Sequence, residues 1–212
     1  MTMRMRLLAG AGSPMEFAEV LRRRRMIRSY TTRPVPPDAL EAVLAAALRA
    51  PSAGFTQGIS LLVLRSARER DAFWRACETA DSAWLRGMQL APVLIAVWTS
   101  QETYLDRYAE PDKGWNDRDP ARWSAPYWFI DAGMASMAAL LSAVDHHLGA
   151  CFFGIPADRI AAVRQAFGVP ASQLSVGVIS LGYPAASETR IVGSPARRSR
   201  KDAAELIHRG VW

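Results

Sequence analysis

The chain has 212 residues, half of them hydrophobic and 22% charged, with a formal net charge of +6 at pH 7. This length and composition fit one compact domain with a real core, and they exclude a wholly disordered or fibrous protein. No apolar run approaches the roughly 20 residues that span a bilayer. Arginine makes up 24 of the 26 basic residues, which raises a nucleic acid or an anionic ligand as a partner, although a GC-rich genome produces the same bias.

The cysteines and the N-terminal residues bear on the cellular location of the protein. The two cysteines, Cys77 and Cys151, are isolated from each other and do not indicate a disulfide framework, which favours a reducing, cytoplasmic location. Residues 1–14 are predicted to form a flexible leader, because their apolar run is too short for a signal peptide and helical periodicity begins at Met15. A single domain is expected over residues 15–212.

The first half of the chain is predicted to alternate helices with strands. Apolar periodicity predicts helices over 16–25, 38–50 and 67–79, the second of them with Asp38 as its N-cap. Two short apolar runs, at 59–64 and 93–98, predict buried strands. Prolines between the first two helices predict a rigid extended connector.

The second half contains a long polar segment followed by a long helix. Residues 99–125 are polar, contain prolines and lack clear periodicity, so 99–128 is expected to form a lid or substrate segment. The almost uncharged stretch 131–148 is predicted to be a core or dimer-interface helix that Gly149 ends as a left-handed glycine. Strands are expected at 150–153 and 176–181, with a helix opened by Pro156 between them. This order favours layered α+β or α/β architecture.

Four segments could carry chemistry, and each also has a structural explanation. Four consecutive arginines and Arg28 lie near a helix end, where cations suit phosphate but also favour the helix dipole. The loop 50–58 offers hydroxyls and an amide, and glycines in 149–156 permit close approach to a flat ligand. The basic stretch 197–201 resembles many solvated tails. The chain shows no metal-ligand spacing of histidines, no Walker loop, no GxGxxG and no GxSxG.

Taken together and in this order, the four segments resemble the FMN-dependent nitroreductase family. The family's RRSxRxF motif corresponds to residues 24–30, its APSxxNxQPW loop to 50–59, and its small-residue helix with GLGxxxxG to 131–154. Its LGYP corresponds to 181–184 and its RKPLEEVVH to 200–208. The resemblance covers residues 15–210. It implies an α+β three-layer sandwich, with a central, mostly antiparallel sheet flanked by helices, and an intertwined homodimer with two flavins at the interface.

The resemblance also assigns site residues by position. Arginines from the two ends of the chain would hold the FMN phosphate, loop residues would meet the ring or ribityl chain, and backbone N–H groups after the strand would face N5 and O4 of the ring. The residues expected to bind FMN are Arg24, Arg25, Met26, Arg28, Pro51, Ser52, Ala53, Thr56, Gln57, Phe153, Gly154, Ile155, Arg198 and Arg200. The residues expected on the substrate side are Trp115, Trp123, Tyr127 and Trp128. They could stack on an aromatic acceptor, while the last two could equally pack the start of the long helix.

Four positions depart from the family pattern: Met26 replaces a serine, Phe55 replaces the loop asparagine, and Gly58-Ile59 replaces Pro-Trp. The resemblance implies chemistry on the flavin, without a catalytic side chain or a metal. Hydride would pass from NADH or NADPH to FMN, and electrons would then pass to a nitroaromatic, quinone or other small aromatic acceptor in ping-pong fashion.

Two other functions remain open. One is a protein that binds or stores FMN or a deazaflavin without turnover. The other is a basic nucleic-acid binder, whose affinity would fall steeply with salt. It ranks last because no aromatic residues are interleaved with the arginine run. Neither a nucleic acid nor a membrane is therefore expected as a partner.

Overall fold

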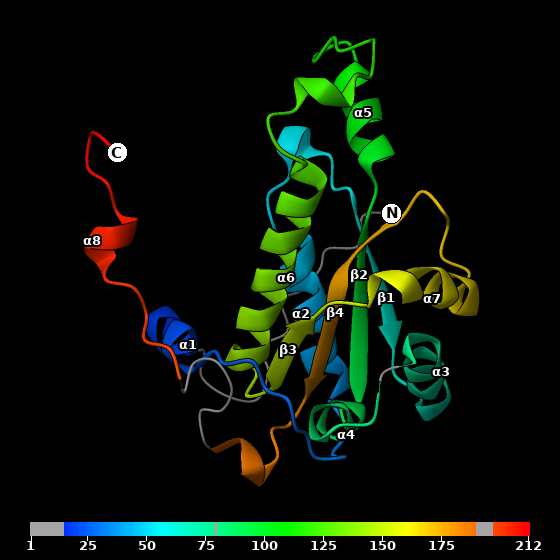
Figure 1. The fold of residues 1–212 in the computed structure, drawn as a ribbon, viewed down its shortest axis with the longest axis vertical. Helices are drawn as coiled ribbons and strands as arrows, with labels where there is room; N and C mark the ends of the chain where they lie inside the picture. The colour runs from blue at the N-terminus through cyan, green and yellow to red at the C-terminus, as the bar shows by residue number, and fades with distance from the viewer. Residues whose placement is uncertain (1–14, 79, 190–196) are drawn as a thin grey trace.

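A four-stranded antiparallel sheet forms the centre of the molecule. The computed structural model describes residues 15–78, 80–189 and 197–212, so the expected leader lies outside the described residues. The sheet has the order β1-β2-β4-β3 and lies between two groups of helices (Figure 1). Its strands are β1 (Ile59–Leu64), β2 (Val93–Thr99), β3 (Gly149–Phe153) and β4 (Leu174–Gly182). The expected three-layer α+β fold with an antiparallel sheet is therefore confirmed.

The helices form two layers and three outlying elements. Helices α2 (Pro37–Leu48) and α6 (Tyr127–Asp145) cover one face of the sheet. Helices α3 (Ala67–Cys77), α4 (Ala83–Gln89) and α7 (Ile160–Phe167) cover the other. Outside these layers, α1 (Phe17–Arg23) lies beside α6, α5 (Gln101–Ala109) extends beyond the end of the sheet, and α8 (Ala203–Leu206) lies apart from it (Figure 1). Short 3-10 turns occur at Ala53–Phe55, Pro120–Arg122, Ala157–Arg159 and Ala186–Thr189.

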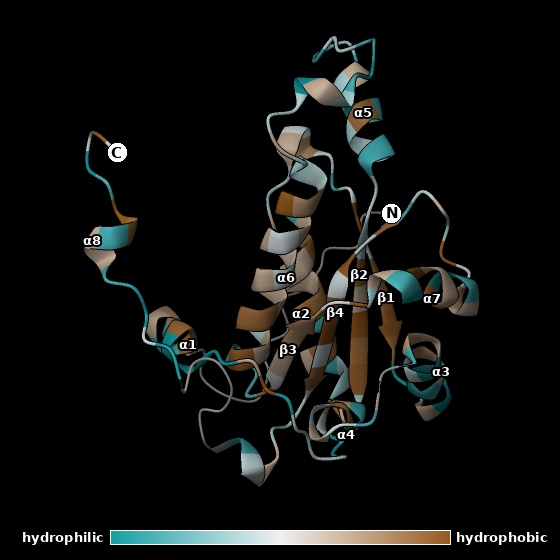
Figure 2. Ribbon diagram, in the orientation of Figure 1, coloured by the Kyte–Doolittle hydropathy of each residue, from teal (hydrophilic) through white to brown (hydrophobic). Residues whose placement is uncertain are grey.

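Strand β2 is central because both of its faces are apolar. All seven of its residues are buried. Its odd-numbered residues from Val93 to Val97 pack against α2 and α6, and its even-numbered residues from Leu94 to Trp98 pack against α3, α4 and α7. A strand covered on both faces reads as a continuous apolar run rather than as an alternation. Figure 2 shows this concentration of hydrophobic residues in the sheet.

Helix α6 is a core helix, as its small residues predicted. Its 19 residues are apolar enough by composition to cross a membrane, yet 44% of its most apolar window is buried inside this fold. Ala135, Ala139 and Ala143 are almost fully buried against α2 and the sheet. These small side chains allow close packing of the two helices, so core packing accounts for the apolar residues on this face of α6.

Two predicted helix caps were wrong. Helix α2 begins at Pro37 with Pro36 as its N-cap, so Asp38 lies in the first turn instead of capping the helix. Helix α6 ends at Asp145, and the residue with the left-handed conformation after it is His147, with a φ of 57°. Gly149 begins β3, where a Cβ would lie 2.8 Å from Ile27 Cγ1. Close packing, not helix termination, therefore explains this glycine.

Two helices were missed, and one is shorter than expected. Residues 99–125 contain α5, and α4 lies between α3 and β2. The aromatic residues of α5 obscured its periodicity, because they pack within a local cluster and not in the main core. Helix α1 ends at Arg23, so Arg24 and Arg25 lie in the extended chain that follows it.

Candidate functional site

The arginine-rich segment after α1 runs alongside the edge strand β3. Met26 forms a parallel bridge with Ala150, the Ile27 N–H donates to the Ala150 carbonyl oxygen over 3.0 Å, and the Phe152 N–H points at Met26 Sδ, 3.5 Å away. Arg24 and Arg28 lie two residues before and two residues after Met26 in the chain. Arg25 and Ile27 both line a surface hollow of about 210 Å³.

Three guanidinium groups of this segment have no carboxylate partner in the described part of the chain. Arg22 and Arg23, in the preceding helix, both pair with Glu19. No ion pair is formed by the side chains of Arg24, Arg25 or Arg28, among the described residues. Arg28 is held in place by its own backbone N–H, which donates to Glu188 Oε1 over 2.9 Å, and its guanidinium donates to the Met26 carbonyl oxygen over 3.1 Å. The segment thus offers cationic donors to an external anion.

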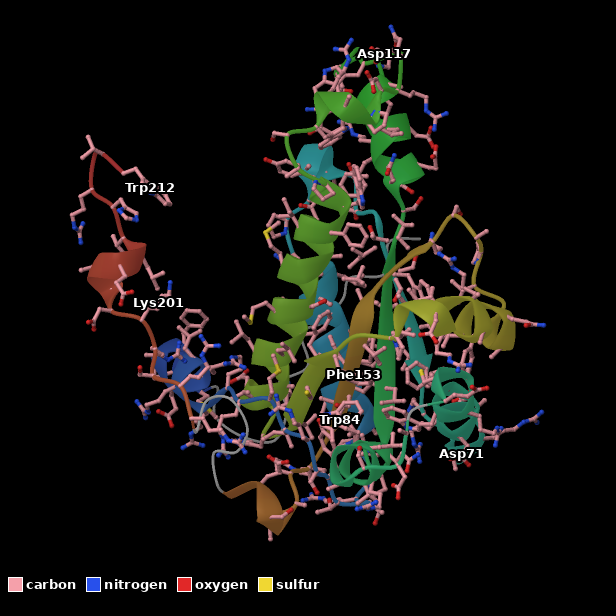
Figure 3. The ribbon with its side chains drawn as sticks, in the orientation of Figure 1. Asp71, Trp84, Asp117, Phe153, Lys201 and Trp212 are labelled. Carbon is pink, nitrogen blue, oxygen red and sulfur yellow. The ribbon has the colours of Figure 1, made fainter. Side chains whose placement is uncertain are left out.

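Strand β3 leads from this segment to an open space at Gly154. A Cβ built on Gly154 would have no neighbour within 4 Å. Immediately before it, the Phe153 ring stacks on Trp74 at 5.7 Å and meets Trp84 edge-on at 5.7 Å, so this ring belongs to the helical layer of α3 and α4 (Figure 3). Ile155 also packs against that layer. What remains available to a ligand here is the backbone and the space beside Gly154.

The loop 51–58 between α2 and β1 has an unusual backbone. Gly54, Phe55 and Gln57 have φ angles of 60°, 56° and 53°. The left-handed region costs a residue with a side chain roughly 1–2 kcal/mol, so other contacts must hold this loop. Within it, Ser52 Oγ accepts from the Gln57 N–H over 2.9 Å, and the Thr56 hydroxyl donates to the Ala53 carbonyl oxygen. The two hydroxyls expected to meet a ligand are thus also used inside the loop.

Helix α5 and the start of α6 hold this loop from outside. The Ala53 N–H and the Tyr104 hydroxyl both donate to Asp131 Oδ2, each over 2.8 Å. Burial, together with this carboxylate, raises the pKa of Tyr104, so its hydroxyl stays protonated and donates. Arg107 Nε donates to the Gly54 carbonyl oxygen over 2.8 Å. These bonds connect three segments that are distant in the sequence.

The aromatic residues expected on the substrate side come together, but largely as a packed cluster. Trp123 lies with its ring centroid 4.4 Å from that of Tyr108, 5.5 Å from Trp115 and 5.5 Å from Tyr127, and it also meets Trp128 at 6.3 Å. Trp128 is buried, while Tyr127 is 37% exposed. We define the aromatic arm as residues 101–128, whose tip carries Asp117 (Figure 3).

One chain does not bring the loop and the arginine segment together. The loop is bonded to Asp131 near the beginning of α6, whereas Arg25 shares its hollow with Val144 and His147 at the other end. The rise of an α-helix places those two points about 20 Å apart. Figure 1 shows the aromatic arm at one end of α6 and α1 at the other.

The C-terminal arginines are exposed and lie in the segment that carries α8. This segment extends away from the sheet toward Trp212 (Figures 1 and 3). In the described residues, neither Arg198 nor Arg200 forms an ion pair, and the short helix between them and the C-terminus is capped reciprocally by Asp202 and Glu205.

Three residues of this site were missed from the sequence: Tyr104, Arg107 and Asp131. Asp131 offered a signal, because it is a single carboxylate in an otherwise apolar stretch that was expected to be buried, and buried charges need partners. Tyr104 and Arg107 offered none, because α5 itself was not predicted. The described residues contain no group of three or more His, Cys, Asp or Glu residues that could hold a metal ion.

Comparisons with known proteins find relatives over most of this chain. The sequence pattern of the Nitroreductase family matches residues 21–183. A protein from Methanothermobacter thermautotrophicus, assigned as an NADH dehydrogenase/NAD(P)H nitroreductase, is 30% identical over 191 residues, which cover 89% of this chain and 88% of the relative. A protein from Archaeoglobus fulgidus with the same assigned name is 28% identical over 173 residues, covering 80% of this chain and 86% of the relative.

Solved structures show the same fold. A protein from Desulfovibrio desulfuricans, assigned as a nitroreductase and crystallised in complex with FMN, is 27% identical, with a TM-score of 0.68 and coverage of 94% of this chain and 99% of that chain. A protein from Exiguobacterium sibiricum, also assigned as a nitroreductase and in complex with FMN, is 20% identical, with a TM-score of 0.73 and coverage of 93% and 98%. By its sequence pattern and its relatives, the chain belongs to the nitroreductase family.

Proposed function

We propose that this protein is an FMN-dependent oxidoreductase that uses NADH or NADPH to reduce small aromatic acceptors such as nitroaromatics or quinones. The observation that carries the proposal is the edge of β3, where arginines that form no ion pair in the described part of the chain run beside a strand that ends in open space at Gly154. Family membership and the FMN bound by related structures support it.

The residues at this edge fit the two chemically different parts of FMN. A phosphate dianion suits guanidinium groups, which bind it through paired hydrogen bonds. Among the described residues, the guanidinium groups of Arg24, Arg25 and Arg28 form no ion pair. Arg198 and Arg200 would add to them from the C-terminal segment. A flat ring suits the space at Gly154, where the absence of a side chain permits close approach.

When bound, FMN supplies the redox chemistry, in which a nicotinamide gives up a hydride and an aromatic acceptor receives the electrons in a second, separate step. The chain's own residues would bind FMN and orient its ring. The backbone N–H groups of Gly154 and Ile155 would donate to the ring, and fixed donors favour negative charge there at no cost of reorganisation. The loop residues Ser52, Thr56 and Gln57 would contact the ring or the ribityl chain.

We further propose that the complete site forms in a homodimer. Ile130, Met134 and Met137 recur at helical spacing on α6 and are 42%, 38% and 46% exposed. An apolar stripe of this kind on a core helix favours a second copy. If two copies pack α6 in antiparallel orientation, the loop of one chain meets the arginine segment of the other, which offsets their separation of about 20 Å within one chain.

The test is to purify the protein, record its visible spectrum and titrate apoprotein with FMN. We expect flavin absorption that NADH or NADPH bleaches under anaerobic conditions and that nitroaromatics or quinones restore. A protein that takes up no FMN would contradict the proposal. Bound flavin that neither nicotinamide reduces would instead support a flavin-binding or storage protein without turnover.

A further inference from the structure

Asp131 is a buried carboxylate in a helix that is otherwise almost uncharged. Its residue is 2% exposed, and its neighbour Ala132 is fully buried. The described residues give it no cationic partner, since no ion pair involves it. Burying a carboxylate without a counter-charge is costly, and hydrogen bonds must then stabilise it.

One donor to Asp131 comes from the loop that is proposed to contact FMN, and the other comes from the aromatic arm. The Ala53 N–H belongs to the loop 51–58, and the Tyr104 hydroxyl belongs to the aromatic arm. Both reach the same oxygen, Oδ2, over 2.8 Å. One carboxylate therefore joins the loop to the arm through charge-assisted bonds, which are roughly twice as strong as neutral ones.

Close packing beside the carboxylate reinforces this connection. Tyr104 is fully buried, and a Cβ on Gly58 would lie only 2.4 Å from its Cε2 atom. Thr99 Oγ1 donates to the Gly58 carbonyl oxygen over 2.7 Å. The loop is thus held near its beginning through Ala53 and at its end through Gly58, and Tyr104 takes part at both places.

We propose that Asp131 is a positioning residue, which fixes the strained loop 51–58 against the aromatic arm in the conformation that contacts FMN. This inference rests on the proposed function. It explains why a charge is kept in the core: without it, the left-handed residues Gly54, Phe55 and Gln57 would relax. It also makes the position of the arm, and with it the acceptor side of the site, depend on the same carboxylate.

The first experiment measures hydrogen exchange of the loop in the flavin-free protein. Asp131→Asn keeps the size of the side chain and one acceptor oxygen, but it removes the charge that strengthens both hydrogen bonds. We expect amide exchange in residues 51–58 to become at least about tenfold faster. The matched control is Ser136→Ala, since Ser136 is also buried on α6 but donates only to the Ala132 carbonyl oxygen of its own helix, over 2.8 Å. Loop exchange that stays unchanged in Asp131→Asn, or rises equally in Ser136→Ala, would overturn the inference.

The second variant guards against a general loss of folding. Tyr104→Phe removes one donor and leaves the Ala53–Asp131 bond in place. We expect a smaller increase in loop exchange than in Asp131→Asn, and a double variant whose effect is less than additive, because the two side chains share one interaction. Fully additive effects would show that the two residues act independently and would contradict a shared positioning role.

The final measurement is the FMN dissociation constant of each variant, from the quenching of flavin fluorescence. We expect the dissociation constant to increase about tenfold for Asp131→Asn and not to change for Ser136→Ala. If Asp131 had only a structural role, its replacement would lower the thermal stability without changing the FMN affinity of the folded protein. If the wild-type protein bound no FMN, the proposed function would fail, whereas the exchange data would still decide whether Asp131 positions the loop. If FMN bound to Asp131→Asn as tightly as to wild type, the positioning role would fail and the proposed function would stand.

Discussion

Arg107 in α5 donates a hydrogen bond from Nε to the carbonyl oxygen of Gly54, at 2.8 Å, in the loop between α2 and β1. The remaining nitrogens of the same guanidinium donate to both carboxylate oxygens of Asp112, at 2.7 and 2.8 Å. One side chain therefore bonds the strained loop on one side and the turn that follows α5 on the other. This arrangement helps to order the aromatic arm.

Replacing Arg107 with alanine should destabilise the loop and the arm together. A hydrogen bond from a charged group in a partly buried position contributes about 1–2 kcal/mol, and the Arg107 side chain is only 23% exposed. We expect Arg107→Ala to lower the free energy of unfolding by about that amount in chemical denaturation. Arg118→Ala is the control, because Arg118 pairs with Glu102 and Asp106 in a more exposed position, where ion pairs contribute about 0–1 kcal/mol. Equal losses in the two variants would contradict the assigned role of Arg107.

The ion pair in the arm should respond to acid. Hydrogen bonding from Arg107 holds the pKa of the Asp112 carboxyl below its ordinary value of 3.8. Because the folded-state pKa is the lower one, the stabilisation is present above the unfolded pKa, near pH ~4, and is lost as the pH falls through the folded pKa. NMR titration of the Asp112 carboxyl carbon should give a midpoint below 3.8 in the wild type and one closer to 3.8 in Arg107→Ala. A wild-type midpoint at the ordinary value would show that the pair does not form.

Two glycine substitutions should distinguish a glycine that leaves space for FMN from a glycine that allows close packing. Gly154→Ala places a methyl group where nothing lies within 4 Å, so we expect an unchanged melting temperature without FMN but weaker FMN binding. Gly58→Ala places a methyl group 2.4 Å from Tyr104 Cε2, and such overpacking costs roughly 1–3 kcal/mol. Differential scanning fluorimetry with and without FMN measures both effects. Undiminished FMN affinity in Gly154→Ala would place the ring elsewhere.

The proposed dimer interface can be tested on the exposed stripe of α6. Met134→Glu introduces a charge at a position that is 38% exposed in one chain, so the fold of the monomer should tolerate it. We expect sedimentation to show a dimer for the wild type and a monomer for this variant, because an unpaired charge is costly in an apolar interface. Leu90→Glu alters an exposed leucine after α4, 45% exposed, and should leave the dimer intact. A wild-type monomer, or a Met134→Glu dimer of wild-type stability, would contradict the interface.

Replacement of Arg24 and of Arg25 should weaken FMN binding to different extents. Arg24 lies two residues before Met26, which bridges to β3, whereas Arg25 lines the hollow near His147. We expect Arg24→Ala to raise the FMN dissociation constant by at least about tenfold, the equivalent of one charge-assisted bond, and Arg25→Ala to raise it less. Isothermal titration of the apoprotein gives both values. A larger effect of Arg25→Ala would place the phosphate on the side of the hollow.

Much of the scaffold could be predicted because its signals are local. Every residue from Val93 to Trp98 is apolar. Small and apolar residues recur at helical spacing from Asp131 to Leu148. Both patterns were interpreted correctly as a buried strand and a core helix, with errors of a few residues at the ends. The order of the motifs also indicated the family, which the match over residues 21–183 confirms.

The errors arose where tertiary contacts override local patterns. Asp38 is a good N-cap by type, yet proline at the first helical position sets the start of α2. Gly149 has the sequence position of a helix-ending glycine, yet the close approach of Ile27 and Pro184 requires it in β3. Helix α5 was missed because its aromatic residues pack into a cluster that only the folded arm creates.

By itself, the sequence determined which segments are buried and which carry arginines, hydroxyls and glycines, because burial and composition are properties of short stretches. Only the tertiary structure decided that Arg25 lines the hollow near His147, that the loop and the arginine segment lie at opposite ends of α6, and that Asp131 connects the loop to the arm. These relationships depend on hydrogen bonds between residues as far apart as Ala53 and Asp131, and no local pattern contains the geometry of such long-range contacts.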